Sequence, residues 1–169
     1  MARWDLSSAM ELLRAERFGQ ALDVVRDLPP EAAADPEVLL LRATLLTHNG
    51  QLPEAVRSCE ELLGVDELNA GAHYLLALCR EGLGDQEGAR HHDQLAAYLD
   101  PSFAMPRLHM GLMCRRAGDG AGAGRELAEA LDLLRREDGS RLLLFGGGFT
   151  REALAALCRA ELVAGEGAA

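Results

Sequence analysis

The chain has 169 residues, of which 27 are acidic and 17 are basic, and its formal net charge at pH 7 is −10. This balance argues against a nucleic-acid partner, because binding to a phosphate backbone needs clustered positive charge. Aromatic residues make up 4% of the chain and hydrophobic residues 49%. Such a composition favours close-packed helices over a β-sandwich, whose strands are enriched in aromatic and β-branched residues. The length predicts one domain.

The sequence contains no segment with the pattern of a membrane span or a secretory signal. No apolar run approaches the roughly 20 residues that a helical membrane span needs. The first residues, 1–5, lack the apolar core of a signal peptide. We therefore expect a cytoplasmic protein with no membrane insertion.

Residues 2–35 and 36–69 are each predicted to form two helices joined by a short turn. The second helix of the first unit ends before Pro29, because proline cannot continue a helix. Asp35 and Pro36 are a favoured pair of N-cap and first helical residue. They mark the start of the second unit.

Residues 70–103 and 104–137 repeat this plan, and a turn at Gly84 separates the two helices of the first of them. In the last unit, four alternating glycines fall where the second helix should begin: Gly118, Gly120, Gly122 and Gly124. A glycine inside a helix costs about 0.5–1 kcal/mol relative to alanine. We therefore expect this helix to fray or to begin late.

The sequence changes character after the four units. Residues 138–149 are rich in glycine and are predicted to be a flexible connector, with Phe145 and Phe149 docking on the repeats. Residues 150–164 have apolar side chains at helical spacing and are predicted to form a capping helix. The tail, 165–169, is expected to be disordered.

A single period runs through all four units. Small or apolar residues recur at equivalent positions, and the three sets are Ala9, Ala43, Ala77 and Gly111; Ala21, Ala55, Ala89 and Ala123; and Leu28, Leu62, Ala96 and Ala130. A helix–turn–helix unit of about 34 residues, as found here, is the signature of the tetratricopeptide (TPR) repeat. We therefore expect an all-α fold, a right-handed α–α superhelix, with a C-terminal capping helix because a stacked array exposes the apolar side of its last repeat.

No motif in the sequence indicates catalysis, a metal or a cofactor. The cluster from His91 to Asp93 would point in different directions on a helix, so we interpret it as a solvated face and not as a metal site. Residues 146–148 are glycines without the GK[ST] ending of a phosphate-binding loop. We expect this chain to have no catalytic residue, metal or cofactor of its own.

The concave face of the repeat array is the remaining candidate for a site. Positions 5 and 9 of each repeat face the inner groove and supply Leu6, Met10, Leu40, Thr44, Tyr74, Leu78, Leu108 and Leu112. All except the threonine are apolar. They are either core residues or the lining of a groove for an amphipathic helix or an extended peptide. Basic residues at the rim would suit an acidic partner, with Arg3 and Arg14 at one end and Arg115 and Arg116 at the other.

Two stretches carry a resemblance to a narrower family. Residues 98–112 contain YLDPSFA and HMGL, and residues 145–162 contain FGGGFTREAL and LCRAEL. They resemble the C-terminal TPR extension of bacterial CheR-type chemotaxis methyltransferases, the FrzF-like branch especially. The resemblance implies a parent protein that uses S-adenosylmethionine to methylate glutamates on chemoreceptor helices. Because the family's catalytic domain has no counterpart here, the resemblance further implies an excised C-terminal fragment, with Met1 added as a start.

These observations leave two functions open. The first is a protein–protein interaction module that regulates or targets the methyltransferase, its groove holding a chemoreceptor cytoplasmic helix or the enzyme's own methyltransferase domain. The alternative is a structural TPR domain that mediates self-association, for example as a homodimer, or acts as a spacer without a peptide ligand.

Overall fold

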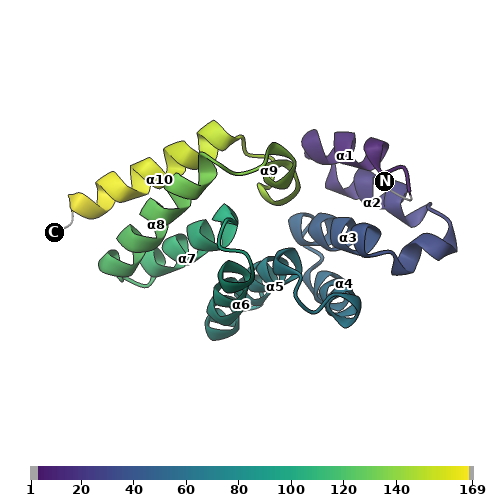
Figure 1. Ribbon diagram of the computed structural model, residues 1–169, viewed down its shortest axis with the longest axis horizontal. Coiled ribbons are helices and arrows are strands. Elements are labelled where there is room, and N and C mark those ends of the chain that lie inside the picture. The colour runs from purple at the N-terminus through teal and green to yellow at the C-terminus, as the bar shows by residue number, and fades with distance from the viewer. Residues whose placement is uncertain (1–3, 168–169) are drawn as a thin grey trace.

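The computed structural model describes residues 4–167, and this range contains ten α-helices, one short 3₁₀ helix and no strand (Figure 1). The all-α prediction is thereby confirmed. The elements are α1 (Ser7–Arg14), α2 (Phe18–Arg26), η1 (Pro30–Ala34), α3 (Pro36–His48), α4 (Leu52–Val65), α5 (Ala70–Gly82), α6 (Gln86–Leu99), α7 (Ala104–Arg116), α8 (Gly120–Leu134), α9 (Gly139–Phe145) and α10 (Arg151–Glu166).

The first eight helices form four consecutive pairs that follow one another along an arch (Figure 1). Helix α10 packs against α8 at one end of the arch. Helix α9 lies between the two arms and contacts α1 and α3, although both of these elements are far from it along the chain. Segment α9 therefore joins the two ends of the array.

One residue in each inter-helix turn has a left-handed backbone, at the same position of each repeat. Gly50, Gly84 and Gly118 have φ values of 77°, 88° and 80°, and Glu16 occupies the equivalent position of the first pair with φ 58°. Glycine accepts this conformation without a steric penalty, whereas glutamate does not. The first turn thus keeps the geometry of the others despite an unfavourable residue.

The expectation that the second helix of the last pair begins late is wrong. Helix α8 begins at Gly120, the position equivalent to Gln86, which is the first residue of α6. The carboxylate of Asp119 accepts a hydrogen bond from the Gly122 amide at 2.8 Å, and a Cβ on Gly122 would collide with that carboxylate. The cap offsets the low helix propensity of the glycines.

The prediction of a flexible connector at residues 138–149 is also wrong. This stretch contains helix α9, whose N-cap Asp138 accepts a hydrogen bond from the Ser140 amide at 2.8 Å. Phe145 is buried against the repeats as expected, but the side chain of Phe149 is 63% exposed. The expected docking of Phe149 is therefore not seen.

Helix α10 continues through Gly165 and Glu166, which the sequence placed in a disordered tail. Residues 168 and 169 of that tail lie outside the described range. Thr150 caps the start of α10, since its hydroxyl accepts a hydrogen bond from the Ala153 amide at 3.1 Å.

Phe145 is the residue that fixes α9 in the arch. Its ring centroid lies 5.1 Å from that of Phe103 and 5.9 Å from that of Tyr74. The ring also lies against the backbone of α5 at Gly71, where an added Cβ would come within 2.6 Å of Phe145 Cζ. Glycine at this position is therefore a steric requirement for the seat of α9.

We predict that Gly71→Ala displaces α9 and lowers the free energy of unfolding by about 1–3 kcal/mol, the usual cost of overpacking. Gly19→Ala is the matched control, because Gly19 is also the second residue of its helix and an added Cβ there has nothing within 4 Å. It should change stability by no more than about 0.5 kcal/mol. Urea unfolding and amide hydrogen exchange of residues 139–145 measure the two effects; equal behaviour of both variants would refute the steric role of Gly71.

Candidate functional site

The residues predicted to line the groove are divided into two groups by α9. Leu6, Met10 and Leu40 line a cavity of about 610 Å³, which we call the α1–α9 cleft. Tyr74, Leu78, Leu108 and Leu112 line a smaller cavity of about 210 Å³ on the other side of Phe145. Phe145 contributes to both cavities. The groove is therefore partly filled by the chain itself.

Thr44 lines neither cavity. It is fully buried, and its hydroxyl donates a hydrogen bond to the Leu40 carbonyl at 2.8 Å. Within a helix this bond satisfies the hydroxyl locally, so Thr44 offers no group to a ligand.

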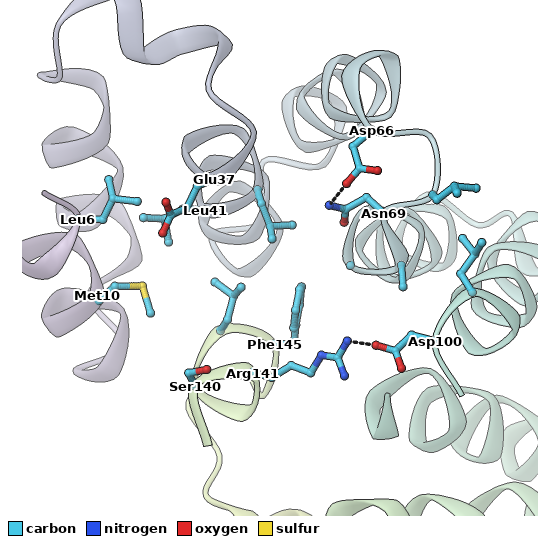
Figure 2. Close-up of a pocket in the computed structure, with 16 residues that line it drawn as sticks. Leu6, Met10, Glu37, Leu41, Asp66, Asn69, Asp100, Ser140, Arg141 and Phe145 are labelled. Atoms are coloured by element: carbon cyan, nitrogen blue, oxygen red, sulfur yellow. Dashed lines mark hydrogen bonds and ion pairs between the residues drawn. The ribbon is translucent and has the colours of Figure 1, made fainter. Parts of the chain in front are cut away.

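The α1–α9 cleft has apolar walls from the α1 segment, α3 and α9, to which Leu68, Ala70 and Leu99 add. Leu6 and Met10 come from the α1 segment, Leu40 and Leu41 from α3, and Leu144 from α9. Figure 2 shows Leu6 and Met10 on one side of the cavity, and Ser140, Arg141 and Phe145 of α9 below it. Its volume falls within the range of about 300–1,000 Å³ that is usual for ligand sites.

Three of the six polar residues that line this cleft are carboxylates. Glu37 lies in the first turn of α3, Asp66 follows α4, and Asp100 follows α6. Asp66 accepts a hydrogen bond from the Asn69 side-chain amide at 3.0 Å. Although partial burial opposes it, hydrogen bonds from Ser102 and Arg141 lower the pKa of Asp100, which keeps this carboxyl ionised near pH 7.

Arg141 is the one basic residue that lines the cleft among the residues described, and its charge is already engaged. Its guanidinium forms an ion pair with Asp100 (Figure 2) and another with Glu137, 3.1 Å away. It also lies over the Phe103 ring, 4.4 Å from the centroid. These contacts hold α9 in place and leave the cleft with an acidic rim.

The smaller cavity belongs largely to the core. Tyr74 and Leu108 are each only 3% exposed, and both lie in the main apolar cluster of the C-terminal half. Leu78 and Leu112 are half-buried at its edge. Tyr74 and Leu108 are therefore core residues, whereas Leu78 and Leu112 remain candidates for the lining of a groove.

Two of the four arginines expected at the rim, Arg115 and Arg116, have intramolecular partners. Arg115 donates to the Glu161 carbonyl at 2.8 Å and pairs with the Glu161 carboxylate at 3.4 Å. Arg116 pairs with Glu81 at 2.5 Å. Arg14 is exposed at the end of α1, and Arg3 lies outside the described residues. Neither Arg115 nor Arg116 lines the α1–α9 cleft.

A buried polar chain connects α5, α6 and α7, and the sequence analysis missed it. The Nδ1 atom of His109 lies 2.5 Å from Asp93 Oδ2, and its Nε2 atom lies 3.2 Å from Glu81 Oε2. Asp93 is 0% exposed, so the interpretation of Asp93 as part of a solvated face is wrong. The signal was present, because Asp93 falls four residues after Ala89 and three before Ala96, on the buried face of α6.

Asp93 and His109 shift each other's pKa values. Burial raises the pKa of Asp93 to about 6, against the opposing hydrogen bond from His109. Burial alone would lower the pKa of His109, but Asp93 and Glu81 outweigh it and raise it. The two groups therefore favour each other's charged forms in the core, close to the smaller cavity that His109 lines.

The described part of the chain offers binding groups more than reactive ones. The Ser140 hydroxyl at the cleft donates a hydrogen bond to Asp138 at 2.5 Å. The hydrogen bonds from Ser140 lower the pKa of Asp138, so the Asp138 carboxylate is a weak base. Within residues 4–167 there is no group of three or more His, Cys, Asp or Glu side chains placed to hold a metal ion. No helix in the same range has both the length and the apolar character to cross a membrane.

We predict that His109→Leu lowers the free energy of unfolding by about 3–5 kcal/mol, because it leaves the Asp93 carboxylate buried without its partner. The double variant Asp93→Leu/His109→Leu should recover most of this loss. Since the unpaired Asp93 would have a pKa raised further above its unfolded value of 3.8, the loss should be small at low pH and grow as the pH rises. Urea unfolding at pH 5 and pH 8 tests both statements, and a double variant less stable than His109→Leu at pH 8 would contradict them.

Comparison with known proteins gives likenesses of structure. No model of a protein family matches the chain, and no curated protein matches it either. Among solved structures, PcrH of Pseudomonas aeruginosa in complex with the chaperone binding region of PopD has 22% sequence identity and a TM-score of 0.65, covering 84% of this chain and 96% of that chain. The type III secretion translocator chaperone SycD of Yersinia enterocolitica has 18% identity and a TM-score of 0.64, covering 83% and 96%.

A double mutant of MamA from RS-1 is a third similar structure, with 21% identity and a TM-score of 0.60, covering 81% of this chain and 79% of that chain. All three are TPR-like helical repeat proteins. At these identities the likeness concerns the fold, and it confirms the fold class expected from the repeat period. The chain has the fold of a TPR-type helical repeat protein.

Proposed function

We propose that this chain is a protein–protein interaction module that binds a segment of another protein in the α1–α9 cleft. The observation that carries the proposal is the cleft itself, a cavity of about 610 Å³ with apolar walls from α1, α3 and α9. A helix or extended segment binds such a groove through a few apolar anchors. The cleft lies where α1 and α3 meet α9, which is distant from them along the chain. Its shape therefore depends on how these three elements pack together.

The structural neighbours support this proposal at the level of fold. PcrH was solved in complex with the chaperone binding region of PopD, and also with that of PopB. A shared fold does not carry a shared partner, so these complexes support a protein partner for this chain and do not identify it.

For the partner itself, we propose a chemoreceptor methyltransferase system, in which this chain targets or regulates a CheR-type enzyme that uses S-adenosylmethionine. The partner is then a chemoreceptor cytoplasmic helix or the methyltransferase domain, in the bacterial cytoplasm. The support is the resemblance at residues 98–112 and 145–162. The two stretches interact in the structure, since the Phe103 and Phe145 ring centroids lie 5.1 Å apart.

Self-association is the second candidate, and exposed apolar side chains on the helix ends favour it. Tyr98 is 83% exposed at the end of α6, and Val65 is 61% exposed at the end of α4. Such residues can join two copies when they form a continuous patch. This candidate needs no ligand in the cleft.

The experiment that tests the proposal measures binding of the chain to an immobilised methyltransferase domain and to an immobilised receptor cytoplasmic fragment. We predict that Leu6→Ser/Met10→Ser weakens the affinity for the bound partner by about 30–900-fold, because each lost apolar anchor contributes roughly 1–2 kcal/mol. Tyr74 and Leu108 are unsuitable targets, since truncation in the core would cost about 2–5 kcal/mol of stability.

The control variant is Val65→Ser/Tyr98→Ser, which changes two exposed side chains that do not line the cleft. Circular dichroism verifies that both variants stay folded. Binding of the methyltransferase domain alone indicates an internal regulator, and binding of the receptor alone indicates a targeting arm. If neither ligand binds and the control pair abolishes a concentration-dependent increase in mass, self-association replaces the proposal.

A further inference from the structure

The charge around the α1–α9 cleft is opposite to the charge that the sequence suggested for the groove. Three carboxylates line the cleft, those of Glu37, Asp66 and Asp100, and the single guanidinium of Arg141 is shared between Asp100 and Glu137. Within residues 4–167, neither Glu37 nor Asp66 forms an ion pair with an arginine. Both are exposed, and the side-chain amide of Asn69, which donates a hydrogen bond to Asp66, is neutral, so both charges are available to a ligand.

The apolar wall lies directly beside Glu37, and Asp66 lines the same cavity further along. Glu37 and Leu41 lie one turn apart on α3, and Figure 2 shows them close together, facing the cavity. Leu6 and Met10 continue the apolar wall on the α1 side, and both are half-buried. An apolar side chain that enters the cleft therefore places its neighbours near Glu37 and Asp66.

Helix α9 shows which chemistry this concave face already accepts. It presents an arginine to Asp100 and an aromatic ring to the backbone at Gly71, and these two residues of α9 are four positions apart. Leu144 of the same helix contacts both apolar clusters of the molecule. The chain thus fills one half of its groove with a segment that is basic and apolar. The open half has apolar walls and carboxylates, like the half that α9 occupies.

We propose that the α1–α9 cleft selects a segment in which a large apolar side chain is flanked by lysine or arginine. The inference rests on the proposed function and specifies the chemistry of its partner. The apolar side chain occupies the space between α1, α3 and α9. The flanking lysine or arginine side chains pair with Glu37 and with Asp66. The net charge of −10 adds a long-range attraction for such a segment and raises its association rate at low salt.

This selection decides between the two proposed partners at this cleft. A glutamate-rich receptor helix would bring carboxylates next to Glu37 and Asp66, and like charges placed together in an interface cost binding free energy. A basic segment of the methyltransferase domain, or of another protein, meets the opposite sign. The cleft therefore favours the basic partner.

The test uses three labelled synthetic helical peptides of equal length, followed by fluorescence anisotropy. The first contains leucine, alanine and lysine, the second has glutamate in place of lysine, and the third has alanine in place of leucine. We expect the leucine–lysine peptide to bind at least about 10-fold more tightly than either of the others, and its affinity to fall as salt is raised.

Two variants locate the effect. Glu37→Gln/Asp66→Asn should reduce the preference for lysine over glutamate by at least about 5-fold, whereas the control Glu129→Gln/Glu152→Gln removes two carboxylates outside the cleft and should preserve it. Equal or tighter binding of the leucine–glutamate peptide overturns the charge inference and leaves the proposed function intact. Binding that is indifferent to leucine, or absent for all three peptides, overturns the inference; if Leu6→Ser/Met10→Ser also leaves protein partners bound, the proposed function fails with it.

Discussion

The contact between the Phe145 ring and the backbone at Gly71 is the constraint on which the rest of the site depends. Because no Cβ is present there, the ring can sit against α5 and beside Phe103 and Tyr74. That seat holds α9 inside the arch, and α9 in turn forms one wall of the α1–α9 cleft. A protein with a larger residue at position 71 would have the same repeats and a different concave face.

The repeat architecture could be predicted from the sequence because it depends on a period. Small residues such as Ala77 and Ala89 are fully buried where the paired helices meet, and their recurrence from one repeat to the next is visible without a structure. Helix α9 could not be predicted in this way. It has seven residues, too few to be stable alone, and it is helical because Leu142 and Phe145 are buried against distant helices.

The candidate site was predictable only in its apolar part. Leu6, Met10 and Leu40 follow from their positions in the repeat, and the structure places them around one cavity. Their acidic neighbours Asp66 and Asp100 occupy equivalent positions of successive repeats, each directly after a helix, but this recurrence does not by itself show that they border a cavity. The buried Asp93 was hidden for a different reason: an acidic residue on a helix is usually solvated, and only its partner on another helix makes its burial tolerable.

Helix α9 also changes how this array should unfold. In an open solenoid each repeat contacts only its neighbours, so the stability is close to a sum of local contributions and the ends can unravel independently. Here α9 contacts α1 and α3 from the far end of the chain. Loss of the first helix pair therefore removes support from the C-terminal segment as well. We therefore expect the packing of α9 to couple the two ends of the array, so that they lose their structure together and not independently.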